Sequence, residues 1–296
     1  MSIPPPSYAH PGPPPEHPER PEGAPERSRR SGLPPWRWWM GLVGVAVGLA
    51  VPIVLGVIAG IGVAISGGDA GDLPSGVLIA LTFFQDLGFI AAALFVARMA
   101  RRPSARDFGL VTTPFWRAVG IVIGVYVAFY VVTGIWAALL NLDDQSDLPD
   151  ELGADTSTAA LIAVMVLVCV MAPVAEEFLF RGLLFTSLRA SAGLWPAAII
   201  TGAVFGAIHA GSSPVGFLVP LAVLGLGLCL IYAWTRSLYP CVALHAINNA
   251  IAFGVTQDWT WEIPLLIVGG AGVSLLIVVG LGRSLGRGGL GRLSPA

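Results

Sequence analysis

Long apolar stretches separated by short polar ones occupy the chain from residue 36 onward. Stretches of about eighteen residues or more are long enough to cross a hydrocarbon core of about 30 Å as a helix rising about 1.5 Å per residue. The pattern therefore predicts an all-α fold, a polytopic membrane helix bundle of about eight transmembrane helices. The predicted spans are 38–65, 76–97, 115–140, 158–188, 194–210, 215–235, 239–256 and 262–282.

The first 36 residues break this pattern. Residues 1–35 contain twelve of the 24 prolines, interleaved with Glu and Arg and with almost no large apolar residue. Such a segment cannot bury a core, so residues 1–36 are predicted to be a disordered, Pro-rich cytoplasmic tail. The apolar run that begins near Trp38 is longer than the core of a signal peptide, so it is expected to remain as the first membrane anchor.

Composition excludes a water-soluble globule. The chain is 55% hydrophobic and only 11% charged, and its mean hydropathy is +0.78. Too little polar surface is present to cover a soluble domain, so lipid must solvate most of the protein. Cys169, Cys229 and Cys241 lie in apolar stretches without a CxxC spacing, which predicts buried thiols and neither a disulfide framework nor a thiolate zinc site.

The basic residues support the eight-span topology. All sixteen are arginines, and all but Arg181 fall before span one, in loops and tails, or, in the case of Arg117, in the first turn of span three, which are positions that eight spans place on one side. The opposite loops are acidic. The positive-inside rule then predicts a multi-pass protein of the plasma (inner) membrane with both termini cytoplasmic. The terminal arginines are expected to contact anionic lipid rather than nucleic acid, and the oligomeric state stays open.

Pairs of glycines four residues apart recur in the predicted helices. They are Gly44/Gly48, Gly56/Gly60, Gly120/Gly124 and Gly202/Gly206. Small residues at this spacing allow two helices to approach closely, so each pair predicts a packing contact.

Ionisable residues are concentrated in three of the later spans. Span four contains an EExxxR pattern, span five an FxxxH pattern and span seven an HxxxN pattern. Charged groups at bilayer depth are costly and usually functional. The candidate site residues are Glu176, Glu177, Arg181, His209, His245 and Asn249.

Helix rise predicts that these residues share one layer of the membrane. Glu176 precedes Arg189 by thirteen residues, about 20 Å, and His209 lies about 22 Å into span five. The i, i+4 spacing of Glu177 and Arg181 favours a salt bridge that leaves Glu176 free. His245 and Asn249 have the same spacing and face the same way, and Pro173 is expected to loosen the turn before Glu176.

This set of groups fits amide hydrolysis. A carboxylate can act as general base on a water, one imidazole can share that water, and a second imidazole and an amide can donate to the oxyanion. Alternatively, Glu176, His209 and His245 could bind zinc or another divalent metal, because two histidines and a glutamate form a known catalytic ligand set. The sequence does not decide between these two mechanisms.

The three motifs resemble those of the CAAX prenyl protease and bacteriocin-processing (CPBP) family of intramembrane proteases, a family described as metalloproteases. The resemblance covers roughly residues 155–255 and implies an intramembrane endopeptidase that cleaves membrane-associated or C-terminal peptides at a site reached from the cytoplasmic half. The corresponding division of the chain is 37–154, N-terminal transmembrane helices; 155–256, catalytic helices; and 257–296, a last transmembrane helix with an Arg/Gly-rich cytoplasmic tail.

Two other functions use the same residues. The cluster could form a polar network in a non-catalytic membrane scaffold, or it could serve a transporter or proton relay that includes Gln85 and Asp86. Asp86 by itself is expected to be a hydrogen-bonding partner inside the bundle. Two adjacent buried glutamates are poor scaffold residues, because the second carboxylate costs more than it contributes unless it is paired. An endopeptidase is therefore the favoured function.

Overall fold

A computed structural model describes residues 32–142 and 148–290, and within these residues the chain is helical and has no strand. The predicted tail up to residue 31, residues 143–147 of the acidic loop and residues 291–296 lie outside the described part. The helices outside the catalytic segment are α2 (Trp38–Ile65), α3 (Ser75–Ala100), η1 (Ala105–Phe108), α4 (Phe115–Leu140), α5 (Leu148–Glu151) and α12 (Glu262–Leu290).

The segment 155–256, predicted to be catalytic, begins with one continuous helical run, Thr158–Ala192. Its parts are α6 (Thr158–Val166), the π-helical η2 (Leu167–Met171), α7 (Ala172–Glu177), the π-helical η3 (Phe178–Phe185) and α8 (Thr186–Ala192). It continues with α9 (Leu194–Ala207), η4 (Val215–Phe217), α10 (Leu218–Thr235) and α11 (Tyr239–Thr256).

These elements confirm an all-α polytopic bundle, and the protein is a multi-pass membrane protein. Each predicted span is helical, but only six helices in the described part are both long and apolar enough to cross a membrane. The other two are α9, which has fourteen residues, and α11, which has eighteen but carries the polar His245, Asn248 and Asn249. These two helices lead to or contain the candidate histidines.

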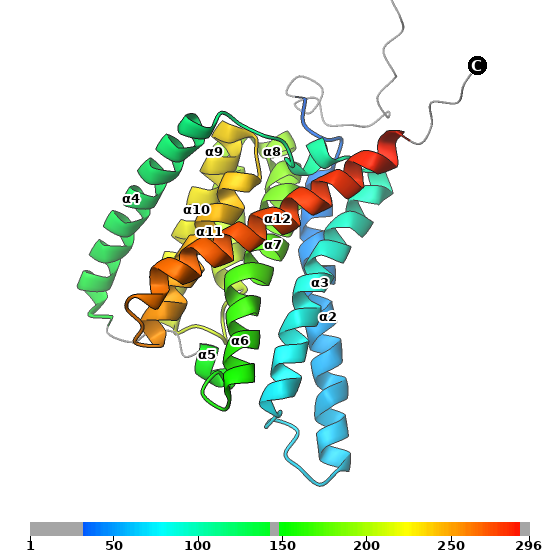
Figure 1. Cartoon of the computed structure of the whole chain (residues 1–296). Coiled ribbons are helices and arrows are strands. Elements are labelled where there is room, and N and C mark those ends of the chain that lie inside the picture. The colour runs from blue at the N-terminus through cyan, green and yellow to red at the C-terminus, as the bar shows by residue number, and fades with distance from the viewer. Residues whose placement is uncertain (1–31, 143–147, 291–296) are drawn as a thin grey trace, which may run out of the picture.

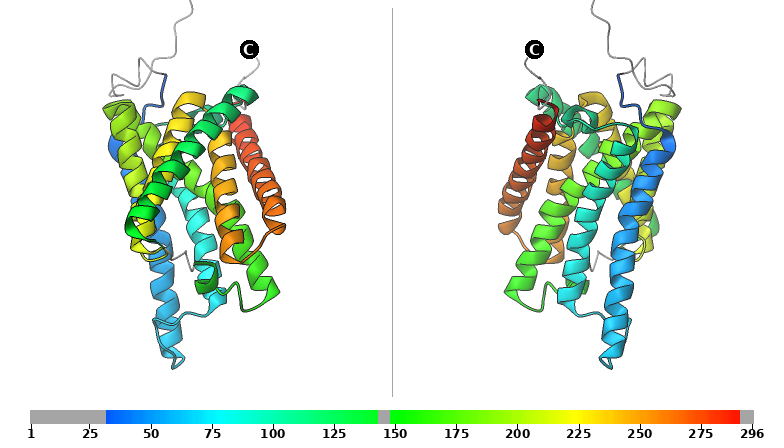
Figure 2. Two further views of the ribbon diagram at one scale, coloured as in Figure 1. Left: turned by 90° about the vertical axis from the view of Figure 1, so that its left-hand side faces the viewer. Right: turned by 90° about the vertical axis from the view of Figure 1, so that its right-hand side faces the viewer.

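The helices pack around the run Thr158–Ala192. α2 and α3 lie side by side at one edge of the bundle and α4 at the opposite edge, with α9, α10 and α11 between them (Figure 1). The first described residues and the end of α12 lie at the same end of the bundle (Figure 2). The chain therefore crosses the bundle an even number of times, as eight spans require.

Two aromatic residues anchor the segments before α2 and α4 to the run Thr158–Ala192. Trp36 and Phe108 are fully buried, with their ring centroids 5.2 Å apart. Phe108 in turn stacks on Phe178, the residue after Glu177, at a centroid distance of 4.1 Å. The connecting segments thus hold the backbone next to the candidate site in place.

Helices pack closely at two of the predicted glycine pairs, Gly44/Gly48 and Gly202/Gly206. A Cβ added to Gly48 would lie 2.7 Å from the ring of Phe89 on α3. A Cβ at Gly202 would lie 2.6 Å from the carbonyl oxygen of Ala222 on α10, so α9 and α10 touch through their backbones. The packing prediction is wrong for Gly120 and Gly124, because nothing lies within 4 Å of a Cβ at either position.

We expect Gly202→Ala to destabilise the protein by about 1–3 kcal/mol, because the new methyl group meets the α10 backbone and neither helix can yield without shifting. Gly124→Ala is the matched control and should change stability by no more than about 1 kcal/mol, since the added methyl group enters open space. Thermal unfolding of the two purified variants in the same detergent measures the difference. Equal melting temperatures of the two variants would contradict the close contact between α9 and α10.

Candidate functional site

The helical run that carries the glutamates is irregular just before them. In η2 the N–H of Ala172 donates to the carbonyl of Leu167, five residues back. The next bond of this π-type series would join Pro173 to the carbonyl of Val168, but proline has no N–H. Asn249 on α11 donates from Nδ2 to this carbonyl at 2.9 Å. Pro173 therefore loosens the turn as expected, and the freed carbonyl fixes Asn249.

Glu177 and Arg181 form the predicted salt bridge at the centre of the bundle. Arg181 Nη1 lies 2.7 Å from Glu177 Oε1, and both side chains are completely buried. Arg181 also donates from Nη2 to the carbonyl of Gly225 at 2.9 Å, and its guanidinium carbon lies 4.6 Å from the centroid of the Phe205 ring. A buried guanidinium is tolerated because a carboxylate, a carbonyl and an aromatic face surround it.

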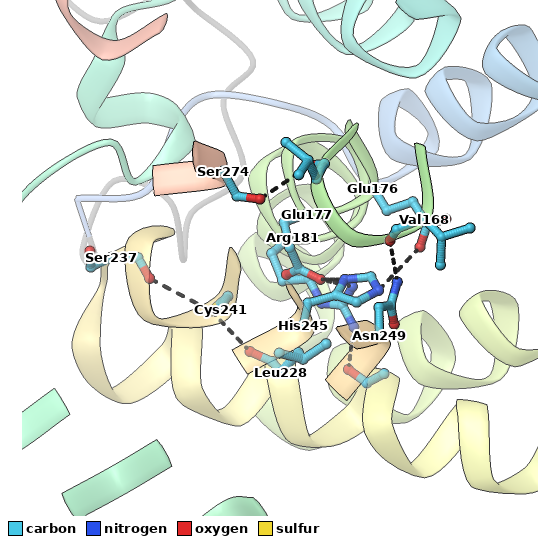
Figure 3. A network of polar contacts seen from close by, with 12 residues as sticks. Val168, Glu176, Glu177, Arg181, Leu228, Ser237, Cys241, His245, Asn249 and Ser274 are labelled. Atoms are coloured by element: carbon cyan, nitrogen blue, oxygen red, sulfur yellow. Dashed lines mark hydrogen bonds and ion pairs between the residues drawn. The ribbon is translucent and has the colours of Figure 1, made fainter. Parts of the chain in front are cut away.

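The same glutamate holds His245. Nδ1 of His245 lies 2.9 Å from Glu177 Oε1, the oxygen that also binds Arg181 (Figure 3). Because a carboxylate oxygen only accepts, Nδ1 carries the proton of this hydrogen bond. The other ring nitrogen, Nε2, faces Glu176 and lies 3.8 Å from its Oε2.

His209 occupies a different position from the one expected. Span five was predicted to continue to residue 210, but α9 ends at Ala207 and His209 lies in the turn after it. Its Nδ1 lies 2.7 Å from the carbonyl oxygen of Phe205, which can only accept, so Nδ1 carries a proton here too. Nε2 of His209 is left as the nitrogen that can bind a proton or a ligand.

Phe205 contacts several residues of the site, although in the sequence it was only the first residue of the FxxxH motif. Its ring centroid is 5.1 Å from that of His209 and 5.7 Å from that of His245, and it is fully buried. The spacing of four residues to His209 is the signal that could have revealed the backbone bond. Nothing in the sequence indicated the contacts with His245 and Arg181, which come from two other helices.

A cavity of about 310 Å³ collects four of the six candidate residues. Glu176, His209, His245 and Asn249 all line it, whereas Glu177 and Arg181 lie behind its wall. Within the described residues, Glu176 Oε2 has no hydrogen-bond partner, although the side chain is only 6% exposed. The structure thus separates a supporting pair from a set of side chains that face an open volume.

The cavity also contains Asp86, which corrects one expectation. Asp86 lies on α3 and lines the cavity, and neither of its carboxylate oxygens has a hydrogen-bond partner in the described structure. The prediction that it acts as a hydrogen-bonding partner inside the bundle is therefore wrong. Gln85 and Thr82 from the same helix also line this cavity.

The predicted metal ligands Glu176, His209 and His245 meet one requirement of a metal site but not another. Both imidazoles keep Nε2 available while Nδ1 donates elsewhere, which is common for metal-binding histidines. However, no three His, Cys, Asp or Glu side chains within 32–142 and 148–290 lie close enough together to hold an ion. Glu176, His209 and His245 do not form a ligand set in this arrangement, and zinc or another divalent metal stays a prediction.

The chain was compared with known proteins. Residues 158–251, about a third of the chain, match the family model described as Rce1-like, type II CAAX prenyl endopeptidase. No curated protein and no solved structure matches. The matched segment contains all six candidate residues, and it confirms the resemblance drawn from the three motifs. At the level of the family, the match supports a CAAX-type intramembrane protease.

We expect Arg181→Met to destabilise the protein by about 3–5 kcal/mol, because it leaves the carboxylate of Glu177 buried without its cation and with only the N–H of His245 as a partner. The double variant Glu177→Leu with Arg181→Met should lose less stability than Arg181→Met alone, since it removes both charges. Thermal or denaturant unfolding in detergent, run as a double-mutant cycle, gives the coupling. Additive losses would show that the pair is not coupled.

Proposed function

We propose that this protein is an intramembrane endopeptidase that hydrolyses peptide bonds of membrane-associated or C-terminal peptide segments. The observation that carries the proposal is the free carboxylate oxygen of Glu176, which is buried and faces a cavity shared with two imidazoles and an amide. A buried carboxylate oxygen without a partner is rare, and a water or substrate that enters the cavity supplies the missing donor.

Glu176 and His209 are proposed to activate the water. Glu176 accepts a proton from it at the free Oε2. His209 donates from Nδ1 to the Phe205 carbonyl, which leaves the Nε2 lone pair to accept the second hydrogen of the same water. Two acceptors then hold one water molecule and turn its oxygen lone pair toward the substrate.

Asn249 and His245 are proposed to stabilise the oxyanion. One Nδ2–H of Asn249 is used by the Val168 carbonyl, and the second remains for a ligand in the cavity. His245 is held from behind by Glu177, and a proton on its Nε2 would be balanced by Glu177 on one side and Glu176 on the other. The i, i+4 spacing on α11 places both donors on one helix face.

The proposed reaction then proceeds in two steps. The water oxygen forms a bond to the carbonyl carbon while Glu176 takes the proton, and the carbonyl oxygen becomes the oxyanion. When the C–N bond breaks, Glu176 returns that proton to the leaving amine. The products are a carboxylic acid and an amine, and the carboxylate of Glu176 is regenerated.

The geometry favours catalysis over a scaffold. Glu177 and Arg181 bind each other, His245 and the Gly225 carbonyl, and the two atoms of this pair that lack a partner, Glu177 Oε2 and Arg181 Nε, belong to residues that do not line the cavity. Glu176 and Asp86 instead keep unpaired oxygens at a cavity. We propose further that both termini are cytoplasmic in the plasma membrane. Both described ends of the chain lie at one end of the bundle (Figure 2), and arginines are concentrated before α2, between α3 and α4 and at the end of α12.

Purified protein in detergent or liposomes should cleave a peptide, and Glu176→Gln should lower kcat/KM by about 10²–10⁴-fold because the base is lost. His209→Ala should reduce it similarly, since the water loses its second acceptor. The measurement is the cleavage rate of a fluorogenic peptide library. Glu262→Gln, the same change at a carboxylate outside the cavity, is the control and should retain full activity.

Three outcomes separate the candidate functions. Equal activity in wild type, Glu176→Gln and His209→Ala rules out the proposed site. Flux of protons or solutes across sealed vesicles that these variants alter, without peptide cleavage, identifies a transporter. Lower thermal stability of the variants without either activity identifies a scaffold.

Metal dependence is a separate prediction. If zinc or another divalent ion takes part, the purified protein should contain about one equivalent of it, and His245→Ala should lose it. Elemental analysis of wild type and variant decides this without an activity assay. Full peptidase activity after exhaustive chelation would reject the metal and leave the proposed water activation by Glu176 and His209.

A further inference from the structure

Asp86 is a buried carboxylate without a counterion. Its side chain is 1% exposed, and both oxygens lack a hydrogen-bond partner in the described residues. No salt bridge in that part of the chain involves it. A carboxylate removed from water and left unpaired is costly, so such groups are normally matched by a cation or by several donors. A ligand that enters from outside the described residues can supply the missing partner.

The cavity shows where that partner can enter. Asp86 lies on its wall together with Thr82, one helical turn earlier on the same face of α3, and Gln85. Thr82 donates its hydroxyl hydrogen to the carbonyl of Leu78 at 3.0 Å, which leaves its oxygen lone pairs for a donor. α3 therefore presents a carboxylate, a hydroxyl oxygen and an amide to the space beside Glu176.

The charge on the cavity wall selects the sign of the ligand. Two carboxyl groups, those of Asp86 and Glu176, line it together with the imidazoles of His209 and His245, and no arginine does. Arg181, the buried cation nearest in sequence to Glu176, already binds Glu177 and the Gly225 carbonyl. A cation that enters this apolar surrounding stabilises the ionised form of Asp86, whereas an acidic ligand would add a further negative charge beside two carboxyl groups.

We propose that Asp86, with Thr82 and Gln85, forms a subsite for a basic side chain of the substrate, lysine or arginine, close to the bond that is cleaved. The proposal rests on the endopeptidase function above and gives it a substrate class. Because the subsite and Glu176 share one cavity of about 310 Å³, the basic residue belongs next to the scissile bond or one residue further away.

The test compares matched peptides on the full-length protein in detergent. The peptides differ at one position, which is moved along the sequence and carries lysine, methionine or glutamate. At one position wild type should prefer lysine over methionine by about 100-fold in kcat/KM, as expected for a buried charge pair. Asp86→Asn should reduce this ratio to near one. The ratio is measured because any effect of Asp86 on Glu176 would change kcat/KM for the lysine and the methionine peptide alike and would leave their ratio unchanged.

Asp72→Asn, an identical change in the exposed α2–α3 loop, is the control and should keep the wild-type ratio. Thr82→Val removes one hydrogen-bond acceptor without changing the charge, so it should lower the lysine-to-methionine ratio partially. This variant replaces Asp86→Asn as the test if Asp86→Asn does not fold. Active wild type without a lysine preference at any position overturns the subsite and leaves the endopeptidase intact. An unchanged preference in Asp86→Asn also overturns it.

A binding measurement separates failure of the subsite from failure of the peptidase. Butylguanidinium should raise the melting temperature of wild type and not that of Asp86→Asn, and its uncharged analogue butylurea should raise neither. If no peptide is cleaved but this pattern appears, the cation subsite stands and the endopeptidase function fails. If butylguanidinium stabilises both proteins equally or neither, the subsite is rejected.

Discussion

The burial of one guanidinium determines how the centre of this protein is built. Arg181 has no exposed surface, so its charge has to be balanced inside the bundle. Glu177 provides that balance from the previous turn of the same run, and the oxygen that binds Arg181 also receives Nδ1 of His245 from α11. The ion pair is thus also the support that aims an imidazole at Glu176, and the run Thr158–Ala192 and α11 are joined at this point.

Access to the cavity divides the intramembrane cluster into two layers. Behind the cavity, Glu177 and Arg181 bind each other and neighbouring groups, and only Glu177 Oε2 and Arg181 Nε of this pair lack a partner. On the cavity wall, oxygens of Glu176 and Asp86 have no partner in the described residues. The first layer supplies rigidity, and the second supplies groups that gain a hydrogen bond only when water or substrate arrives. This difference connects the packing of the bundle to the hydrolysis proposed for it.

The two irregular helix segments beside the cavity each provide a backbone carbonyl that binds a polar side chain. Pro173 releases a carbonyl in the π-helical turn before Glu176, and Asn249 uses it. α9 ends early, so the backbone carbonyl of Phe205 binds the ring of His209 in the following turn. In both cases a backbone group freed from the helix orients a polar side chain at the cavity. Membrane-embedded backbone of this kind is tolerated where protein, and not lipid, surrounds it.

The sequence by itself determined the membrane fold, the helical nature of each predicted span and the i, i+4 pairing of Glu177 with Arg181. These features follow from local spacing: the length of an apolar stretch, the helical repeat and the position of a proline. Tertiary structure alone decided that Glu177 also holds His245, that Phe205 touches both imidazoles, and that Asp86 shares the cavity of Glu176. Those contacts join residues on separate helices, and helix periodicity defines the face of one helix but not which face of another lies against it.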